Sequence, residues 1–263
     1  MTQRLIRGTL KDIVAKAKIN KTRPPAIVII GEVVKLERRF NWLNRTKRIL
    51  FTGLAKERFF NEGRTYFHLP LIKIKPMESY EEFDGHLRNI KRFDWIVFSS
   101  RYGVEYFFKR LNRIGYDSRT LRGISIAAIG SSTSQRLSDF GILADLVPKE
   151  ESSRGLLEEF GRIDLRDKKI FLPRSDISDK GLSDGFKELG AYVLTGFAYR
   201  NVMAEDLPDL DLSFFNEIIF TSPSGVRNFK ARYAYVPAGV KIKSIGAVTE
   251  KEVKKRLSEK RER

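Results

Sequence analysis

The sequence predicts an α/β protein in which parallel sheets are covered by helices on both faces. Three observations support this class. Short apolar runs recur along the chain, and each gives way to Ser, Thr, Gly or Pro. Apolar residues at helical spacing then follow, as in residues 104–111. The same order of segments returns about 120 residues later, which indicates a duplicated unit. Buried strands alternating with amphipathic helices are typical of parallel sheets.

The first 44 residues differ from the rest of the chain. Ile13, Val14 and Ala17 predict a short amphipathic helix within residues 9–19, which the prolines at 24 and 25 end. The apolar run 26–30 predicts a buried strand, and residues 32–42 a mixture of strand and turn. This segment holds too little apolar material for a core of its own.

From residue 47 onward the strand–helix alternation is regular. Apolar runs predict further strands at 49–51, 66–74 (interrupted by Pro70), 95–98, 124–129, 170–172, 192–194, 218–220 and 242–245. Helical spacing or capping residues predict helices at 55–61, 104–111, around 137–140, 152–160 and 181–189, and one after each of the last two strands.

Three pairs of segments carry the repeat. Each pair shares a strand-like run, and the pairs are 98–104 with 220–226, 129–133 with 245–249, and 47–51 with 168–172. Taken alone, the repeat suggests tandem domains at 47–165 and 168–263. Ligands of open parallel sheets bind beyond the carboxyl ends of the strands, where the small polar residues lie.

Charge and composition exclude several classes of function. The net charge is +17, of which residues 1–48 hold +10, residues 250–263 hold +3 and the remaining body only +4. This distribution, without a zinc-finger or RNA-binding motif, argues against nucleic acid as a partner. The absence of Cys excludes disulfides and thiolate chemistry. Since no apolar run approaches 18 residues and no signal peptide is evident, we expect a cytoplasmic protein without a membrane partner.

The segment 221–225 has two interpretations. Ser222 suits a helix N-cap with Pro223 in the first turn, a purely structural role. The same backbone N–H groups and the helix dipole also favour a carboxylate or phosphate. Segments 130–133 and 246–249 carry the same ambiguity. Neither a Walker A loop nor a Gly-x-Gly-x-x-Gly motif is present, which disfavours a nucleotide.

Other candidate residues are few. The two histidines, His68 and His86, lack a metal-ligand pattern and are read as incidental, so no metal is expected. Arg174 follows a predicted strand, where it could hold an acidic ligand or form an ion pair. Tyr199 lies where the second repeat returns, as a site residue or a packed side chain with a bonded hydroxyl.

In combination these motifs resemble uroporphyrinogen-III synthases from about residue 47 to the C-terminus. The resemblance is carried by residues 98–104, 129–133, 171–174, Tyr199, 220–226 and 245–249. It implies two flavodoxin-like, doubly wound parallel-sheet lobes joined by two extended crossings near 69–75 and 197–203, with a cleft between them. Lobe 1 would combine 45–73 with 203–263, and lobe 2 would be 76–200.

The resemblance also implies a reaction. Hydroxymethylbilane, a linear tetrapyrrole with eight carboxylates, is closed to uroporphyrinogen III with its last ring inverted, without metal or cofactor. Tyr199 would assist departure of the terminal hydroxyl. Substrate-binding positions would be Ser100, Arg101, Gly130, Ser131, Thr133, Arg174, Ser222, Ser224, Gly225, Gly246 and Thr249. The pair Arg101-Tyr102 departs from the small residues usual in the family.

Residues 1–44 resemble a different protein, the C-terminal end of uroporphyrinogen-III C-methyltransferase. The matching residues are 8–10, 24–36 and Trp42. Nearly all of a methyltransferase, including its S-adenosylmethionine site, is absent, so we expect no methylation. The resemblance implies a monomer that could contact a C-methyltransferase or hydroxymethylbilane synthase.

Two alternatives to a synthase remain at this point. The chain could be a two-lobed module that binds an anionic ligand reversibly without turnover. It could also be the remnant of a methyltransferase–synthase fusion, in which residues 1–44 dock a methyltransferase chain.

Overall fold

The chain divides into two compact units. The computed structural model describes residues 5–41, 46–55 and 64–257. Unit 1 comprises Met1–Lys73 with Met203–Arg263, and unit 2 comprises Ile74–Val202. The chain therefore passes between units twice, within β3 (Ile72–Lys75) and near the end of β7 (Tyr192–Met203). These two strands are hydrogen-bonded neighbours in one sheet.

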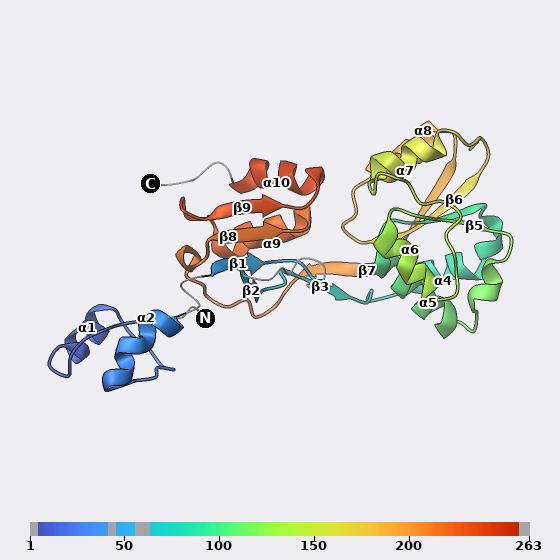
Figure 1. Cartoon of the computed structure of the whole chain (residues 1–263). Coiled ribbons are helices and arrows are strands. Elements are labelled where there is room, and N and C mark those ends of the chain that lie inside the picture. Colours follow the sequence, from blue (N-terminus) through green and yellow to red (C-terminus); the bar gives the residue numbers. More distant parts are fainter. Residues whose placement is uncertain (1–4, 42–45, 56–63, 258–263) are drawn as a thin grey trace. The chain divides into compact units, whose positions relative to one another are not determined.

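Unit 2 is built on a five-stranded sheet of order β3-β7-β6-β4-β5, of which β3, β5, β6 and β7 are labelled in Figure 1. β4 pairs in parallel with β5 and β6, and β6 pairs in parallel with β7. The remaining strands are β4 (Trp95–Phe98), β5 (Ser125–Ala128) and β6 (Lys169–Ser175). The helices are α4 (Glu81–Arg88), α5 (Arg101–Arg113), α6 (Ser131–Ser138), α7 (Ser153–Phe160) and α8 (Gly181–Glu188), with 3-10 turns at Ile90–Arg92 and Ser118–Leu121.

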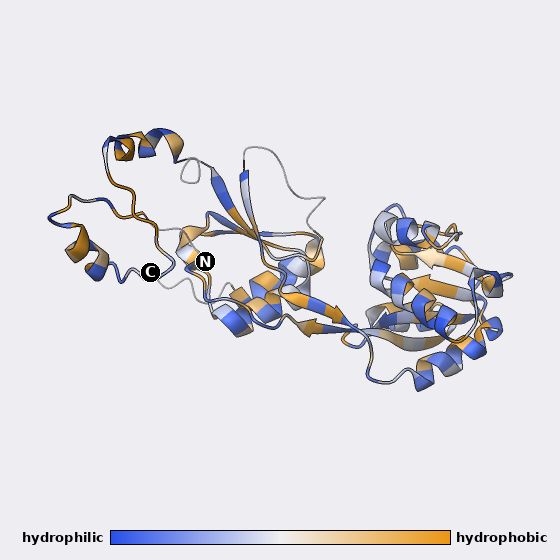
Figure 2. Cartoon of the chain, turned by 90° about the horizontal axis from the view of Figure 1, so that it is seen from below, coloured by the Kyte–Doolittle hydropathy of each residue, from blue (hydrophilic) through white to orange (hydrophobic). Residues whose placement is uncertain are grey.

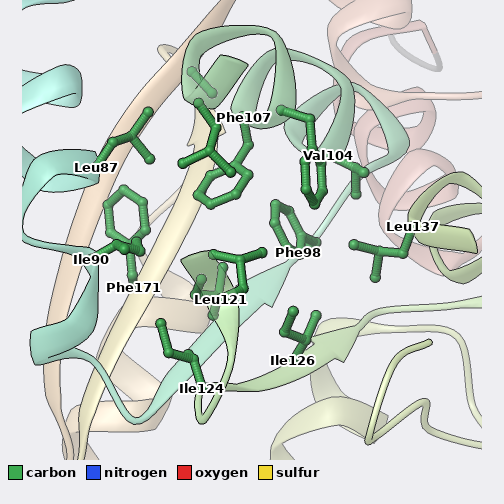
Figure 3. Close-up of a cluster of buried hydrophobic side chains, with 14 of the residues drawn as sticks. Leu87, Ile90, Phe98, Val104, Phe107, Leu121, Ile124, Ile126, Leu137 and Phe171 are labelled. Atoms are coloured by element: carbon green, nitrogen blue, oxygen red, sulfur yellow. The ribbon is translucent and has the colours of Figure 1, made fainter. Parts of the chain in front are cut away.

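Alternate residues of these strands face opposite sides of the sheet. Phe98 and Phe171 pack with Phe107 of α5 in one buried cluster, part of which Figure 3 shows. Val97 and Leu172 belong to a second cluster, which includes residues of α7 and α8. Because side chains alternate along a strand, both faces of the sheet are buried under helices. The predicted α/β class with doubly wound parallel sheets is confirmed for this unit.

Unit 1 contains a four-stranded parallel sheet of order β2-β1-β8-β9. In Figure 2 the strands beside the grey segments, β1 and β2, begin with hydrophilic residues, and apolar residues lie further along them. Its main cluster joins Leu50 and Phe220 to Val226 and Phe229 of α9. The strands are β1 (Lys47–Phe51), β2 (Arg64–His68), β8 (Glu217–Phe220) and β9 (Lys241–Ser244). The helices are α1 (Ile13–Ile19), α2 (Glu37–Phe40), α9 (Pro223–Tyr233) and α10 (Ala247–Leu257), with 3-10 turns at Glu32–Leu36 and Leu212–Phe214.

The sequence repeat maps onto equivalent strands of the two sheets. The paired segments 98–104 and 220–226 start at the last residues of β4 and β8, and 129–133 and 245–249 directly follow β5 and β9. Segment 47–51 is β1, and 168–172 covers the first part of β6. Sheet order is β6-β4-β5 in unit 2 and β1-β8-β9 in unit 1, so the repeated strands occupy matching places. In unit 2 the β6 segment follows the other two in the chain, whereas in unit 1 its counterpart β1 precedes them. The two copies are therefore permuted relative to each other, and the tandem division suggested by the repeat alone is wrong.

Several local predictions are corrected. Residues 26–30 form no strand, and Ile27 is 91% exposed. Among residues 5–41 no described side chain is buried. Residues 32–40 form a 3-10 turn and α2 rather than strand. Helix α4, where Phe83 and Leu87 lie on one buried side, was not anticipated. The helix expected at 55–61 lies almost entirely outside the described residues.

Candidate active site

Tyr199 occupies a bulged position in β7. The register against β6 runs from Arg174 opposite Phe197 to Ser175 opposite Tyr199, so one residue of β7 is extra. A β-bulge changes the direction of the side chains that follow it. Tyr199 is buried, and its hydroxyl oxygen lies 2.9 Å from Oγ of Ser100. The bulge thus directly precedes Tyr199, whose hydroxyl contacts Ser100 at the start of α5.

Ser100 is the N-cap of α5. Its Oγ accepts a 2.9 Å hydrogen bond from the backbone N–H of Gly103, in the first turn of the helix. A Cβ at Gly103 would lie 2.9 Å from the carbonyl oxygen of Pro173 in β6. Glycine therefore allows α5 to approach β6 closely. This approach lets one serine hydroxyl contact both the helix end and Tyr199.

Burial and hydrogen bonding act in opposite directions on Tyr199. Burial raises the pKa of the Tyr199 phenol above its ordinary value, and the hydroxyls of Ser100 and Ser175 reduce that increase. The group is therefore a neutral phenol at neutral pH, able to donate one hydrogen bond.

Arg174 is a buried cation on the neighbouring strand. Only 7% of the residue is exposed, and Nη1 donates a 2.7 Å hydrogen bond to the carbonyl oxygen of Asp179. Its buried Nε has no hydrogen-bond acceptor among the residues that the structure describes. Burial lowers the pKa of Arg174, while the potentials of Asp179 and Tyr199 oppose that shift. Arg174 and Tyr199 thus lie within electrostatic reach of each other.

Arg101 is engaged with its neighbour. Its Nη2 donates a 2.8 Å hydrogen bond to the hydroxyl of Tyr102, and the guanidinium carbon lies 4.9 Å from that ring's centre. The Tyr102 ring lies 6.0 Å from that of Tyr199. The unusual Arg101-Tyr102 pair therefore lies beside the tyrosine that the resemblance singles out.

The start of α6 is occupied by an acid. The backbone N–H of Ser131 donates a 3.0 Å hydrogen bond to Oε1 of Glu151, which sequence reasoning did not select. Gly130 is the N-cap, and the side chain of Thr133 is almost fully buried. The positive end of α6 thus already holds a carboxylate of the chain.

Unit 1 carries matching helix starts. Ser222 caps α9 as predicted: its Oγ accepts a 3.1 Å hydrogen bond from Gly225 N–H and lies 3.2 Å from Oγ of Ser224. The caps Ser100 and Ser222 also share their backbone conformation, with φ of −162° and −155°. Gly246, before α10, has φ +82°, and Thr249 is buried within that helix.

The structure brings some predicted residues together but not all. Within unit 2, Tyr199 contacts Ser100, and Arg174 lies on the neighbouring strand β6, one residue before the position opposite Tyr199. Ser222, Ser224 and Gly225 form a cluster at the start of α9 in unit 1. Sequence reasoning missed Ser175 and Glu151. No local pattern marks either residue, because their contacts depend on the bulge and on a loop that follows α6 by many residues.

The two histidines lie in different units, His68 in unit 1 and His86 in unit 2. Nε2 of His68 lies 2.7 Å from the carbonyl oxygen of Gly53. In the described part of the chain no group of three or more His, Cys, Asp or Glu side chains could hold a metal ion. No described helix has the length and apolarity needed to cross a membrane.

Comparison with known proteins identifies the family. The model of the family "uroporphyrinogen-III synthase HemD" matches residues 55–259. The porphyrin biosynthesis protein HemD of Ruminiclostridium josui is 24% identical over 265 residues, which cover 89% of this chain and 50% of that protein. This chain thus spans half of that relative's length. A stretch of 34 residues, 13% of this chain, is 56% identical to part of a uroporphyrinogen-III C-methyltransferase of Methanocaldococcus jannaschii, 14% of that protein.

The fold is also found among solved structures. A mutant uroporphyrinogen III synthase from the extremely thermophilic bacterium Thermus thermophilus matches with a TM-score of 0.57 at 18% identity, covering 80% of this chain and 89% of that one. This likeness supports the α/β fold with two parallel sheets. Because the family model spans most of the sequence, the chain belongs to the uroporphyrinogen-III synthase family.

Proposed function

We propose that this protein is a lyase that cyclises hydroxymethylbilane to uroporphyrinogen III with inversion of the last ring. The proposal rests on family membership, on the contact between Tyr199 and Ser100, and on the buried Arg174 of the neighbouring strand. It requires no metal or organic cofactor. The alternative, a module that binds an anionic ligand reversibly, makes a different prediction, because such a module would hold hydroxymethylbilane without converting it.

The single observation that carries the proposal is the buried Nε of Arg174. A buried donor without an acceptor is costly, and such groups are rare in folded proteins. Nη1 is held by Asp179, so the guanidinium keeps a fixed orientation. A carboxylate of the substrate would supply the missing acceptor through a charge-assisted hydrogen bond. We therefore assign Arg174 to binding an acetate or propionate group.

Tyr199 is assigned to departure of the terminal hydroxyl. Its neutral phenol donates to the hydroxyl oxygen as the carbon–oxygen bond breaks, so that oxygen leaves with the bonding electrons as water. The pyrrole nitrogen supplies the electron pair that replaces the lost bond, giving an azafulvene cation. Attack by the substituted carbon of the last ring gives a spiro intermediate, and its rearrangement inverts that ring. The proton released on final closure restores the phenol.

The helix starts are assigned to the remaining carboxylates. The amide groups at the starts of α5, α6, α9 and α10 are suited to anions, and the positive helix ends favour them. Thr133 and Thr249 are each only 3% exposed, so we assign their role to the backbone. The other residues assigned to substrate binding are Ser100, Arg101, Gly130, Ser131, Ser222, Ser224, Gly225 and Gly246.

The isomer assay tests this function. Purified protein is incubated with hydroxymethylbilane, and the oxidised products are separated by chromatography. The type III isomer should predominate with the protein, and the type I isomer, formed by spontaneous closure, without it. Only type I in both samples, together with tight binding of the substrate, would instead support the reversible binding module.

We further propose that residues 1–44 are a methyltransferase remnant separate from lobe 1 (45–73 with 203–263) and lobe 2 (76–200). Exposed Ile27–Ile30 would contact a uroporphyrinogen-III C-methyltransferase. We also propose a cytoplasmic monomer that receives its substrate from hydroxymethylbilane synthase. Co-purification with each enzyme, repeated with Ile27→Asp, tests the contacts, and light scattering tests the monomer.

A further inference from the structure

Two serines from different elements, Ser100 and Ser175, lie next to Tyr199. Ser100 approaches from α5, with its Oγ 2.9 Å from the Tyr199 hydroxyl. Ser175 is the last residue of β6 and lies directly opposite Tyr199 in the strand register after the bulge. Ser175 is only 5% exposed. A buried serine in this place needs a partner for its hydroxyl.

Each serine hydroxyl has a second neighbour. Oγ of Ser100 already accepts from Gly103 N–H, which leaves its own proton available. Oγ of Ser175 lies 3.2 Å from Oγ of Ser178, in the turn that follows β6. If Ser178 donates to Ser175, the proton of Ser175 is also available. Both available protons can then point at the same phenol oxygen.

The main chain fixes this turn against β7. Asp176 N–H donates a 3.1 Å hydrogen bond to the carbonyl oxygen of Tyr199. Oδ1 of Asp176 in turn accepts a 2.9 Å hydrogen bond from the N–H of Asn201. Ser178 N–H donates to the carbonyl oxygen of Ser175 at 3.2 Å. Ser175 is therefore held in place relative to Tyr199 by the hydrogen bonds of the turn that follows it.

We propose that Ser175 is a positioning residue which, together with Ser100, donates to the phenol oxygen of Tyr199 and so directs the phenol proton away from both serines. An oxygen that accepts two hydrogen bonds has its lone pairs occupied, and its own proton remains for a third group. The catalytic part of this inference rests on the proposed function, since the third group would be the departing hydroxyl. Burial raises the pKa of Tyr199, and both serine hydroxyls oppose that rise, which agrees with donation from each.

The first test needs no substrate. The pKa of Tyr199 is measured by NMR of protein labelled with ¹³C-tyrosine, its signal assigned by Tyr199→Phe. Ser175→Ala should raise this pKa, because a donor that stabilises the phenolate is lost. Ser175→Thr, which keeps the hydroxyl, should restore the wild-type value. The control is Ser183→Ala in α8, which removes a comparably buried hydroxyl that donates to the carbonyl oxygen of Lys180, and it should leave the Tyr199 pKa unchanged.

The second test is kinetic. With hydroxymethylbilane, Ser175→Ala should lower kcat about tenfold, the effect of one lost charge-stabilising hydrogen bond, with KM nearly unchanged. Ser175→Thr should recover most of kcat. If Ser175→Ala does not fold, Ser175→Cys keeps the volume with a weak donor and should shift the pKa in the same direction.

The two proposals fail in different ways. A Tyr199 pKa that is the same in wild type, Ser175→Ala and Ser175→Cys would overturn the role of Ser175, whatever the turnover. Absence of turnover in the wild type would instead overturn the proposed function, and the NMR titration would still decide the hydrogen bond.

Discussion

The carboxylate of Glu151 accepts a 3.0 Å hydrogen bond from the backbone N–H of Ser131 in the first turn of α6. The same side chain fills the space beside Gly130, where an added Cβ would lie 2.5 Å from Oε2. The φ of Gly130 is −178°, which any residue adopts, so only the end of the Glu151 side chain would have to move for a larger residue at this position. A helix start assigned to a substrate carboxylate is thus occupied by the protein's own acid.

Replacing Glu151 should strengthen substrate binding. Glu151→Gln and Glu151→Ala remove a negative charge that competes for the start of α6, so KM for hydroxymethylbilane should fall about two- to fivefold, as expected from the energy of a charge at a helix end. Glu158→Gln, which removes an exposed acid paired with Arg154 in α7, is the control. An unchanged KM in both Glu151 variants would mean that α6 does not bind a substrate carboxylate.

Removing the Tyr199 hydroxyl should slow turnover selectively. Tyr199→Phe keeps the buried ring but loses the donor, so we expect kcat to fall on the order of 100-fold with little change in KM. Steady-state kinetics with product isomer analysis measure this. Tyr233→Phe loses a hydroxyl bonded to Pro208 O in unit 1 and should keep its activity. Equal turnover in wild type and Tyr199→Phe would remove Tyr199 from the mechanism.

The titration of Tyr199 should appear in the stability of the fold at alkaline pH. Folding raises the pKa of Tyr199 above its ordinary value of 10.0, so the folded state holds this proton more tightly than the unfolded chain. The resulting stabilisation is present below the unfolded pKa and is lost as the pH rises through the folded pKa. The free energy of unfolding in urea should therefore fall less steeply with pH above about pH 10 for Tyr199→Phe than for wild type. If the free energy of unfolding depends on pH in the same way in both proteins, burial does not raise the pKa of Tyr199.

Replacement by alanine should change the stability of the fold in opposite directions at Gly103, where α5 approaches β6 closely, and at Gly85 in α4. Gly103→Ala places a Cβ 2.9 Å from the Pro173 carbonyl oxygen, so the free energy of unfolding should fall by about 1–3 kcal/mol. At Gly85 in α4 an added Cβ meets nothing within 4 Å, so Gly85→Ala should raise it by about 0.5–1 kcal/mol. Urea denaturation of both variants measures the difference. Equal stabilities would indicate that α5 moves to accept the methyl group.

The sequence predicted features that depend on local chemistry. Ser222 caps α9 with Pro223 in the first turn, because both preferences act within a few residues. The strand predicted at 26–30 is wrong, since an apolar run becomes a strand only when another strand pairs with it, and none of the described strands does. The roles assigned to Tyr199 came from a family resemblance and stay predictions. Ser175 could not be predicted, because its place opposite Tyr199 depends on a bulge in another strand.

The interleaved path of the chain has a consequence for the order of folding during synthesis. Unit 2 is continuous from Ile74 to Val202 and leaves the ribosome complete. β1 pairs with β8 through Ile49 and Glu217, so the centre of the unit 1 sheet cannot close until the last quarter of the chain has emerged. Domains generally fold as units while the chain is still growing. The edge of β1 that pairs with β8 therefore stays unpaired while the whole of unit 2 is translated. At this exposed strand edge the nascent chain most needs protection from aggregation.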